Sequence, residues 1–177
     1  MRITVYLGAS PGKDPRLGDA VRALGTWIGE RGHSLVYGGS RSGLMGLLAE
    51  SVLAAGGTVT GVEPRFFVEA GLVYDDITEL IVTETMAERK GKMIELGDAF
   101  LAFPGGTGTL EEIAEVMSLT ALGHLEAPCI LYDLGGYYTG LRTQLRRMID
   151  TGLSTPERQK HIFFAESLEE IREILES

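Results

Sequence analysis

The amino-acid sequence predicts an α/β protein with a parallel β-sheet covered by helices on both faces. Short apolar runs, such as residues 3–7 and 99–103, alternate along the chain with longer segments in which apolar residues recur at helical spacing. Runs that are apolar throughout are typical of strands buried on both faces, and their alternation with helices is typical of a parallel sheet. The length of 177 residues suits one domain with a sizeable core, so residues 1–177 are expected to form a single domain.

The first half of the chain shows this alternation clearly. Leu17, Val21 and Leu24 recur at spacings of four and three residues, and Ile28 follows four residues later, which predicts an amphipathic helix. A second helix is expected to end at the glycine pair 56–57, since glycine commonly follows the last helical turn. The expected strands are residues 3–7, 34–37, 58–62 and 79–83, the helices are 17–28 and 44–55, and a less regular stretch covers 63–76.

The second half continues the pattern to the last helix. A charged helical segment precedes an apolar strand, and the glycine-rich turn after this strand opens another helix. No repeat, low-complexity segment or linker interrupts the alternation. The expected helices are residues 86–96, 109–122, 137–149 and 168–175, and the expected strands are 99–103, 128–132 and the short apolar segment 162–164.

Charge and composition exclude several classes of partner. A formal net charge of −9 argues against a nucleic-acid backbone, because neutralising its phosphates needs a concentrated basic surface. No apolar run is long enough to span a bilayer, and the apolar start of the chain is too short for a secretory signal. Cys129, the only cysteine, lies in an apolar run and is predicted to be a small core residue. We expect a cytoplasmic protein.

Three glycine-bearing turns follow directly on predicted strands, at residues 8–10, 38–40 and 104–108. Because the carboxyl ends of parallel strands meet at one sheet edge, we expect these turns to converge where α/β proteins bind ligands. A helix N-terminus offers free N–H groups and a positive dipole end to an anion, and glycine lets the backbone approach it. The turns predict a phosphate site, although each turn alone equally fits a plain strand-to-helix connection.

Glu112 has two interpretations. Thr109 lies three residues before it, so the two residues fit a capping box, and the spacing alone favours this cap. In the alternative, Glu112 lies one helical turn from the phosphate site, where its carboxylate stabilises positive charge on a ribose or orients a water molecule. Glu111 is expected to be a favourable charge in the first helical turn.

Arg89 and Lys90 lie near the start of the charged helix. One interpretation is a solvated face, with Glu88 and Lys92 available as an ion pair one turn apart. However, cations at a helix N-terminus oppose the helix dipole, so Arg89 and Lys90 gain little from that position. A bound anion explains both residues better.

Familiar nucleotide and metal motifs are absent from the sequence. No P-loop occurs, and Glu111 stands where a dinucleotide fingerprint on Gly106 and Gly108 needs its third glycine. The three histidines have no metal-ligand spacing, and no Ser-His-Asp or Cys-His arrangement is evident. We therefore expect neither a metal nor an organic cofactor.

Two ordered motifs resemble a known family. Residues 104–112 read PGGTGTLEE and match the signature PGGxGTxxE, and residues 86–90 read MAERK and match the associated MxxRK segment. Together with YGGS at 37–40 and GLMG at 43–46, they resemble the LOG family. Its members are cytokinin riboside 5'-monophosphate phosphoribohydrolases, often mislabelled lysine decarboxylases. The likeness covers the chain from the first strand to about Tyr138.

The resemblance implies a Rossmann-like, doubly wound homodimer with active sites near the subunit interface. It also implies metal-free hydrolysis of the N-glycosidic bond of a nucleoside 5'-monophosphate, such as AMP or a cytokinin riboside monophosphate, to free base and ribose 5-phosphate. On this resemblance Arg89 and Glu112 are the catalytic pair. The residues implied to bind the substrate are Gly39, Ser40, Met86, Lys90, Gly105, Gly106, Thr107, Gly108 and Thr109.

The chain departs from the commonest family pattern at several positions. Ala87 replaces a histidine that is often seen there, and Ser118 and Leu119 replace a threonine–tryptophan pair. These differences bear on the choice of base more than on the type of reaction. Glu69 is the candidate for an acidic residue that the family commonly carries in the loop after the third strand.

Other functions remain as alternatives. The first is a carrier or sensor that binds a phosphorylated cofactor and catalyses no reaction, because molybdenum-cofactor carrier proteins are similar to this chain in fold and in the phosphate loop. The second is a nucleotide-sugar or other phosphate-ester enzyme on a similar scaffold. Decarboxylation is disfavoured, because it would normally use a pyridoxal Schiff-base lysine and Lys90 has no recognisable context of that kind.

Overall fold

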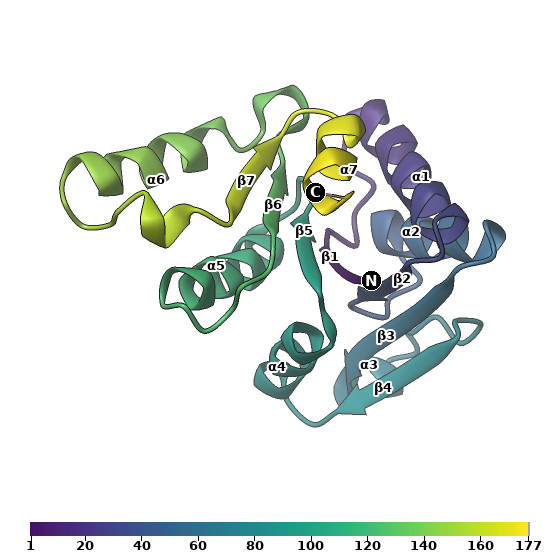
Figure 1. Ribbon diagram of the computed structural model, residues 1–177. Coiled ribbons are helices and arrows are strands. Elements are labelled where there is room, and N and C mark those ends of the chain that lie inside the picture. Colours follow the sequence, from purple (N-terminus) through teal and green to yellow (C-terminus); the bar gives the residue numbers. More distant parts are fainter. Residues whose placement is uncertain (177) are drawn as a thin grey trace.

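The computed structural model describes residues 1–176 and shows one seven-stranded sheet (Figure 1). Neighbouring strands pair in parallel, in the order β4-β3-β2-β1-β5-β6-β7. The predicted strands all form, with ends that differ from the expected bounds by at most two residues. They are β1 (Arg2–Tyr6), β2 (Ser34–Tyr37), β3 (Thr58–Pro64), β4 (Glu79–Thr83), β5 (Ala99–Ala102), β6 (Cys129–Tyr132) and β7 (Ile162–Ala165).

The predicted helices also form, and the stretch 63–76 contains one short helix, α3, that the sequence pattern does not indicate. Asp14 and Thr85 cap the N-termini of α1 and α4 with their side chains, which explains where these helices begin. The helices are α1 (Pro15–Glu30), α2 (Gly43–Ala54), α3 (Arg65–Glu69), α4 (Met86–Leu96), α5 (Thr107–Ala121), α6 (Thr139–Asp150) and α7 (Leu168–Glu176), with short 3-10 turns η1 (Leu134–Gly136) and η2 (Glu157–Gln159).

The helices cover both faces of the sheet, as predicted (Figure 1). α1, α2 and α7 cover one face, where Leu24, Leu48 and Ile171 are fully buried in one hydrophobic cluster. α4, α5 and α6 cover the other face, where Met93 belongs to a second cluster. Cys129 is fully buried in this second cluster, which confirms that it is a core residue, and burial raises the pKa of its thiol to about 12.

The strand order reverses between β1 and β5. From β1 the chain moves outward through β2, β3 and β4, and from β5 it moves outward in the other direction through β6 and β7. The turn after β1 therefore lies beside the turn after β5. Reversals of this kind leave a crevice at the carboxyl ends of the strands, which is the usual ligand site of α/β sheets.

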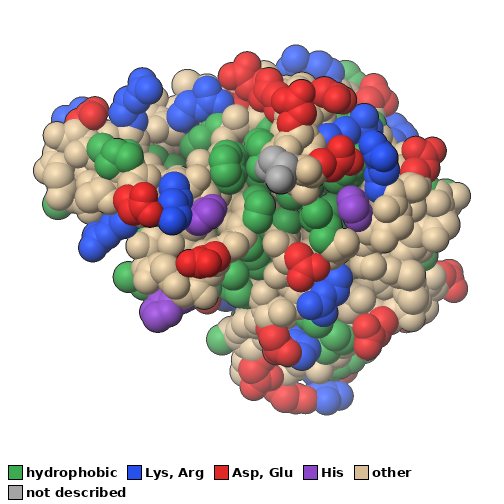
Figure 2. Space-filling model, viewed as in Figure 1, with side chains coloured by type: hydrophobic (Ala, Val, Ile, Leu, Met, Phe, Trp, Pro, Cys, Tyr) green, Lys and Arg blue, Asp and Glu red, His purple; other side chains and the backbone are tan. Residues whose placement is uncertain are grey.

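Charge is distributed unevenly over the surface. α6 contains three arginines, and basic side chains gather over this helix at the left of Figure 2. Elsewhere on the face shown there, acidic and basic side chains are interspersed. None of the helices in residues 1–176 is both long enough and apolar enough to cross a membrane.

Candidate active site

A cavity of about 390 Å³ opens at the carboxyl edge of the sheet. The turns after β1, β2 and β5, the end of β3 and the start of α4 form its wall. Gly8, Ser40 and Gly106 all line it, which confirms the prediction that the three glycine-bearing turns converge. Its volume lies within the usual range of small-molecule sites.

Arg89 on α4 is the buried cation of this cavity. Although α4 begins with a charged sequence, Arg89 is only 8% exposed, so a solvated face does not describe it. Its Nε donates to the carbonyl oxygen of Val62 on β3 over 3.1 Å. Its guanidinium lies against Gly38, where a Cβ would overlap it. The absence of a side chain at Gly38 therefore makes room for the cation.

Glu112 on α5 faces Arg89 in the cavity. Arg89 Nη1 lies 3.6 Å from Glu112 Oε1, and both side chains are largely buried. Burial raises the pKa of Glu112, and the charge of Arg89 opposes this rise. The capping-box interpretation is wrong, because α5 begins at Thr107 with Gly106 as its N-cap, and Thr109 already lies inside the helix.

Glu63, at the end of β3, is an acidic cavity residue that is absent from the predicted site. It is 3% exposed and lines the cavity, whereas Glu69 is exposed on α3 and does not line it. Burial raises the pKa of Glu63 to about 7, with Arg89 lowering it and Glu112 raising it further. The sequence did contain a signal, because Glu63 directly follows an apolar strand at the edge where the turns converge.

The glycines of the turn into α5 have different structural reasons. At Gly105 a Cβ would overlap the side chain of the buried Thr109. At Gly106 and Gly108 a Cβ would meet no neighbouring atom within 4 Å among the described residues, and neither glycine has a positive φ. Both line the cavity beside Thr107. The fold itself therefore does not require glycine at these two positions, and the first N–H groups of α5 are available to a ligand.

Close backbone approaches shape the turn after β2. Gly39 packs against the side chain of Glu63, whose Cγ would lie 2.5 Å from an added Cβ. Gly39 therefore supports the cavity from behind, and Ser40 lines it directly. Gly43 has a φ of 56° and lies against the carbonyl oxygen of Ala9, so the turns after β1 and β2 touch.

The remaining residues of the two motifs divide between the cavity and its surroundings. Met86 lines the cavity. Lys90 does not line it, and instead forms ion pairs with Glu111 and, over 3.0 Å, with Glu115. Glu111 lies beyond the first turn of α5 and lines the cavity, so its predicted role as a first-turn charge is wrong. Lys90 thus connects α4 to α5.

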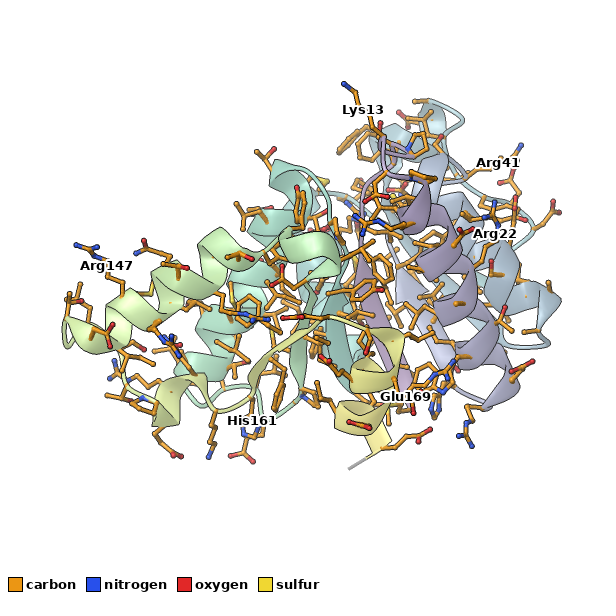
Figure 3. The ribbon with its side chains drawn as sticks, turned by 90° about the horizontal axis from the view of Figure 1, so that it is seen from above. Lys13, Arg22, Arg41, Arg147, His161 and Glu169 are labelled. Atoms are coloured by element: carbon orange, nitrogen blue, oxygen red, sulfur yellow. The ribbon has the colours of Figure 1, made fainter. Side chains whose placement is uncertain are left out.

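A second cavity of about 330 Å³ lies beside the first and shares Gly106 with it. Tyr137 lines this cavity, and its hydroxyl donates to the carbonyl oxygen of Gly105. Lys13 extends outward at its rim, whereas His161 lies at the opposite edge of the molecule (Figure 3). The turn into α5 therefore has open space on two sides.

These features define a Rossmann-like α/β protein with a small-molecule site at its strand-order reversal, where a glycine-rich helix start adjoins a buried arginine–glutamate pair. A protein-family model described as "Possible lysine decarboxylase" matches residues 45–175. The chain belongs to this family, the LOG family that its motifs resemble.

Named relatives are similar over most of their length. A cytokinin riboside 5'-monophosphate phosphoribohydrolase of Rhodococcoides fascians is 39% identical over 94% of this chain and 85% of its own. Its counterpart LOG5 of Arabidopsis thaliana is 40% identical over 92% of this chain and 71% of its own. The solved structure of a molybdenum cofactor carrier protein from Chlamydomonas reinhardtii matches 99% of this chain and 98% of its own, with a TM-score of 0.73. It is 20% identical, which shows a shared fold alone.

Proposed function

We propose that this protein hydrolyses the N-glycosidic bond of a nucleoside 5'-monophosphate and releases the free base and ribose 5-phosphate. The observation that carries the proposal is the buried pair of Arg89 and Glu112, 3.6 Å apart, in a cavity that also holds the start of α5. The names of the relatives support it, because both are phosphoribohydrolases of cytokinin riboside 5'-monophosphates. AMP and cytokinin riboside monophosphates are the candidate substrates.

The 5'-phosphate binds at the start of α5. Free N–H groups and the positive end of the helix dipole favour an anion there, and Thr107 adds a hydroxyl on the cavity wall. Gly106 and Gly108 leave the backbone uncovered. Glycine inside a helix lowers its stability relative to alanine, and the space around Gly108 would accommodate an alanine side chain. The glycine at this position is therefore better explained by a ligand that lies against the backbone. Thr109 lies under the turn against Gly105 and supports its shape.

Arg89 and Glu112 act at the ribose. Breaking the bond between C1' and the base leaves positive charge on the sugar ring, and a carboxylate beside the ring stabilises this charge or orients the attacking water. The charge of Arg89 favours the ionised form of Glu112 in a buried position, and the guanidinium also orients the substrate. Anchoring the phosphate at a distance positions C1' for the reaction.

We also propose a homodimer in which the cavities lie near the interface. Phe66, Leu72, Met86 and Leu110 are large apolar residues that are exposed, and Leu72 and Met86 line the cavity. Contiguous exposed apolar surface commonly marks an interaction site, so these residues are the candidates for the dimer interface. Sedimentation equilibrium measures the assembly, and a mass of about twice 19.1 kDa is expected. A monomer that turns over nucleotide at the same rate at every dilution would contradict this assembly.

Cleavage of AMP by the purified protein is the decisive experiment. Chromatography is expected to show adenine and ribose 5-phosphate with the wild-type protein, and intact AMP with Glu112→Gln. Glu126→Gln, which changes an exposed glutamate after α5, serves as the matched control. If AMP stays intact, isopentenyladenosine monophosphate is tested next. Binding without cleavage of either nucleotide would contradict the enzyme and favour a carrier.

The single cysteine supports a proposal about the compartment. We propose that the protein is cytoplasmic, because Cys129 is a free, buried thiol of the kind that proteins of reducing compartments commonly contain. Fractionation of the source cells, with the protein detected by antibody, tests this location. Recovery in the membrane or secreted fraction would contradict it.

A further inference from the structure

Glu63 is a buried carboxyl group that the reaction described above does not use. It lies at the end of β3 with 3% of its surface exposed, and its Oε2 has no hydrogen-bond partner within residues 1–176. Its Cγ packs closely over Gly39, so the side chain is fixed in the cavity wall. A buried carboxylate without a partner is unfavourable. The position therefore favours either the protonated form or a ligand that supplies the missing partner.

The groups that act on Glu63 come from three elements. Burial is the largest influence and raises its pKa to about 7, while Arg89 of α4 lowers the pKa and Glu112 of α5 raises it. The guanidinium of Arg89 donates to the carbonyl oxygen of Val62 and also faces the carboxylate of Glu112, so its charge does not act on Glu63 alone. Tyr37 of β2 also lies near Glu63, and burial raises the pKa of its hydroxyl. The raised pKa therefore keeps the protonated form of Glu63 accessible near neutral pH.

The other charged neighbours of β3 are directed elsewhere. Arg65 of α3 pairs with Glu84 at the surface over 2.6 Å, and Glu79 of β4 lies beside Thr60. Glu50 of α2 is exposed. The ionisation of Glu63 is consequently governed from inside the cavity.

The cavity thus contains two carboxyl groups in different environments. Glu112 has a cation 3.6 Å away, whereas Oε2 of Glu63 has no hydrogen-bond partner among the described residues. When the environments of two carboxyl groups in one site make their pKa values differ, one group commonly acts as the acid and the other as the base. Cleavage of an N-glycosidic bond needs both, because a purine leaves poorly as an anion.

We propose that Glu63 is the general acid that protonates the leaving base. This inference depends on the proposed nucleotide hydrolysis and adds a catalytic residue to it. The bond between C1' and the base nitrogen breaks, and its electron pair stays with the base. The carboxyl proton of Glu63 passes to a ring nitrogen of the base, which leaves as a neutral molecule.

Water completes the reaction. Its oxygen bonds to C1' of the ribose 5-phosphate, and one of its protons passes to the carboxylate of Glu112. One water is consumed, one base and one ribose 5-phosphate are released, and no oxidant or reductant is needed. Exchange of protons with solvent returns Glu112 to the carboxylate and Glu63 to the acid before the next turnover.

A pair of substrates separates acid catalysis from the other steps. AMP has a leaving group that needs a proton, whereas 4-nitrophenyl β-D-ribofuranoside 5-phosphate releases a stable nitrophenolate without one. Glu63→Gln keeps the size of the side chain but cannot donate a carboxyl proton. It is expected to lower kcat on AMP by about 10²-fold or more and to leave kcat on the nitrophenyl substrate within about threefold of wild type. Glu69→Gln, on exposed α3, is the matched control and should change neither rate.

The pH profile of the wild-type protein supplies a readout that needs no variant. Because the acid must hold its proton, kcat/KM on AMP, which reports the ligand-free protein, should fall as the pH rises above about 7, and kcat/KM on the nitrophenyl substrate should not show this fall. Equal losses on both substrates in Glu63→Gln, or no loss on AMP, would overturn the role of Glu63 while leaving the hydrolysis intact. Failure of the wild-type protein to cleave either substrate would overturn the proposed function and this inference with it.

Discussion

The guanidinium of Arg89 and the carboxylate of Glu112 lie 3.6 Å apart, and about nine-tenths of each side chain is buried. They come from α4 and α5, which pack on the same face of the sheet. Neither charge is favourable in this position alone, because burying an isolated ion is expensive. The pair therefore depends on a geometry that both helices must hold.

Arg89→Lys tests whether that geometry matters for the reaction. A lysine keeps the charge, but its single ammonium group cannot reproduce the planar guanidinium that contacts both Val62 and Glu112. We expect kcat on AMP to fall by about a hundredfold with the fold retained, since small displacements of reacting groups have effects of that size. Steady-state kinetics and circular dichroism measure the two quantities. An unchanged kcat would count against Arg89 as an orienting residue.

Gly38→Ala tests the space behind Arg89. The added Cβ would overlap the guanidinium and approach Met45 Cε to 2.5 Å, so we expect lower activity and a loss of unfolding free energy of about 1–3 kcal/mol from overpacking. Gly91→Ala is the control, because its Cβ would meet open space inside α4 and should stabilise the helix by about 1 kcal/mol. Urea denaturation and AMP turnover separate the effects. Equal behaviour of the two variants would contradict the prediction.

Gly108→Ala separates binding from folding. Gly108 is the second residue of α5, where alanine is sterically allowed and should raise the unfolding free energy by about 0.5–1 kcal/mol. If a phosphate lies against this backbone, the same methyl group weakens AMP binding. Gly140→Ala changes the second residue of α6, which is equally open, and should stabilise without affecting affinity. Calorimetric titration in a Glu112→Gln background measures affinity, and unchanged binding in Gly108→Ala would exclude close contact there.

The raised pKa of Glu63 predicts how stability changes with pH. The folded protein holds this proton up to about pH 7, whereas the unfolded chain releases it near 4.5, so the folded state binds more protons in that interval. Stability from this group is complete below about pH 4.5 and is lost as the pH rises through about 7, a loss of up to about 3 kcal/mol. Glu112 acts in the same direction. Urea denaturation across this range should show a steeper loss of stability with rising pH in wild type than in Glu63→Gln.

Most of the fold could be predicted because its signals are local. The charged helix Met86–Leu96 begins and ends where the sequence indicates, since Thr85 caps it and Gly97 follows it. α3 has five residues, too few to show a helical period. The capping-box interpretation places the N-cap of α5 at Thr109, three residues after the observed N-cap Gly106, because a run of glycines and threonines does not reveal which residue becomes the N-cap.

The site was predicted less completely because burial is a tertiary property. Arg89 stands among charged residues in the sequence, and its burial appears only where α4 packs on β3. Lys90, its neighbour, points to α5 and away from the cavity, which the sequence motif does not distinguish. Glu63 precedes a proline that suggests a loop, yet β3 continues through Pro64 and places the carboxyl group in the cavity.

The contact between Gly43 and the carbonyl oxygen of Ala9 affects how the protein can change over generations. Two backbones that touch cannot be separated by a new rotamer, so an insertion in either turn displaces the other. The cavity wall formed by these two turns is therefore poorly suited to gradual remodelling. On the side of α3 the wall consists of side chains such as Phe67 and Leu72, which single substitutions can enlarge or reduce. If the proposed nucleotide site is correct, the α3 side of the cavity can change its preference for a ligand while the wall formed by the two turns is inherited unchanged.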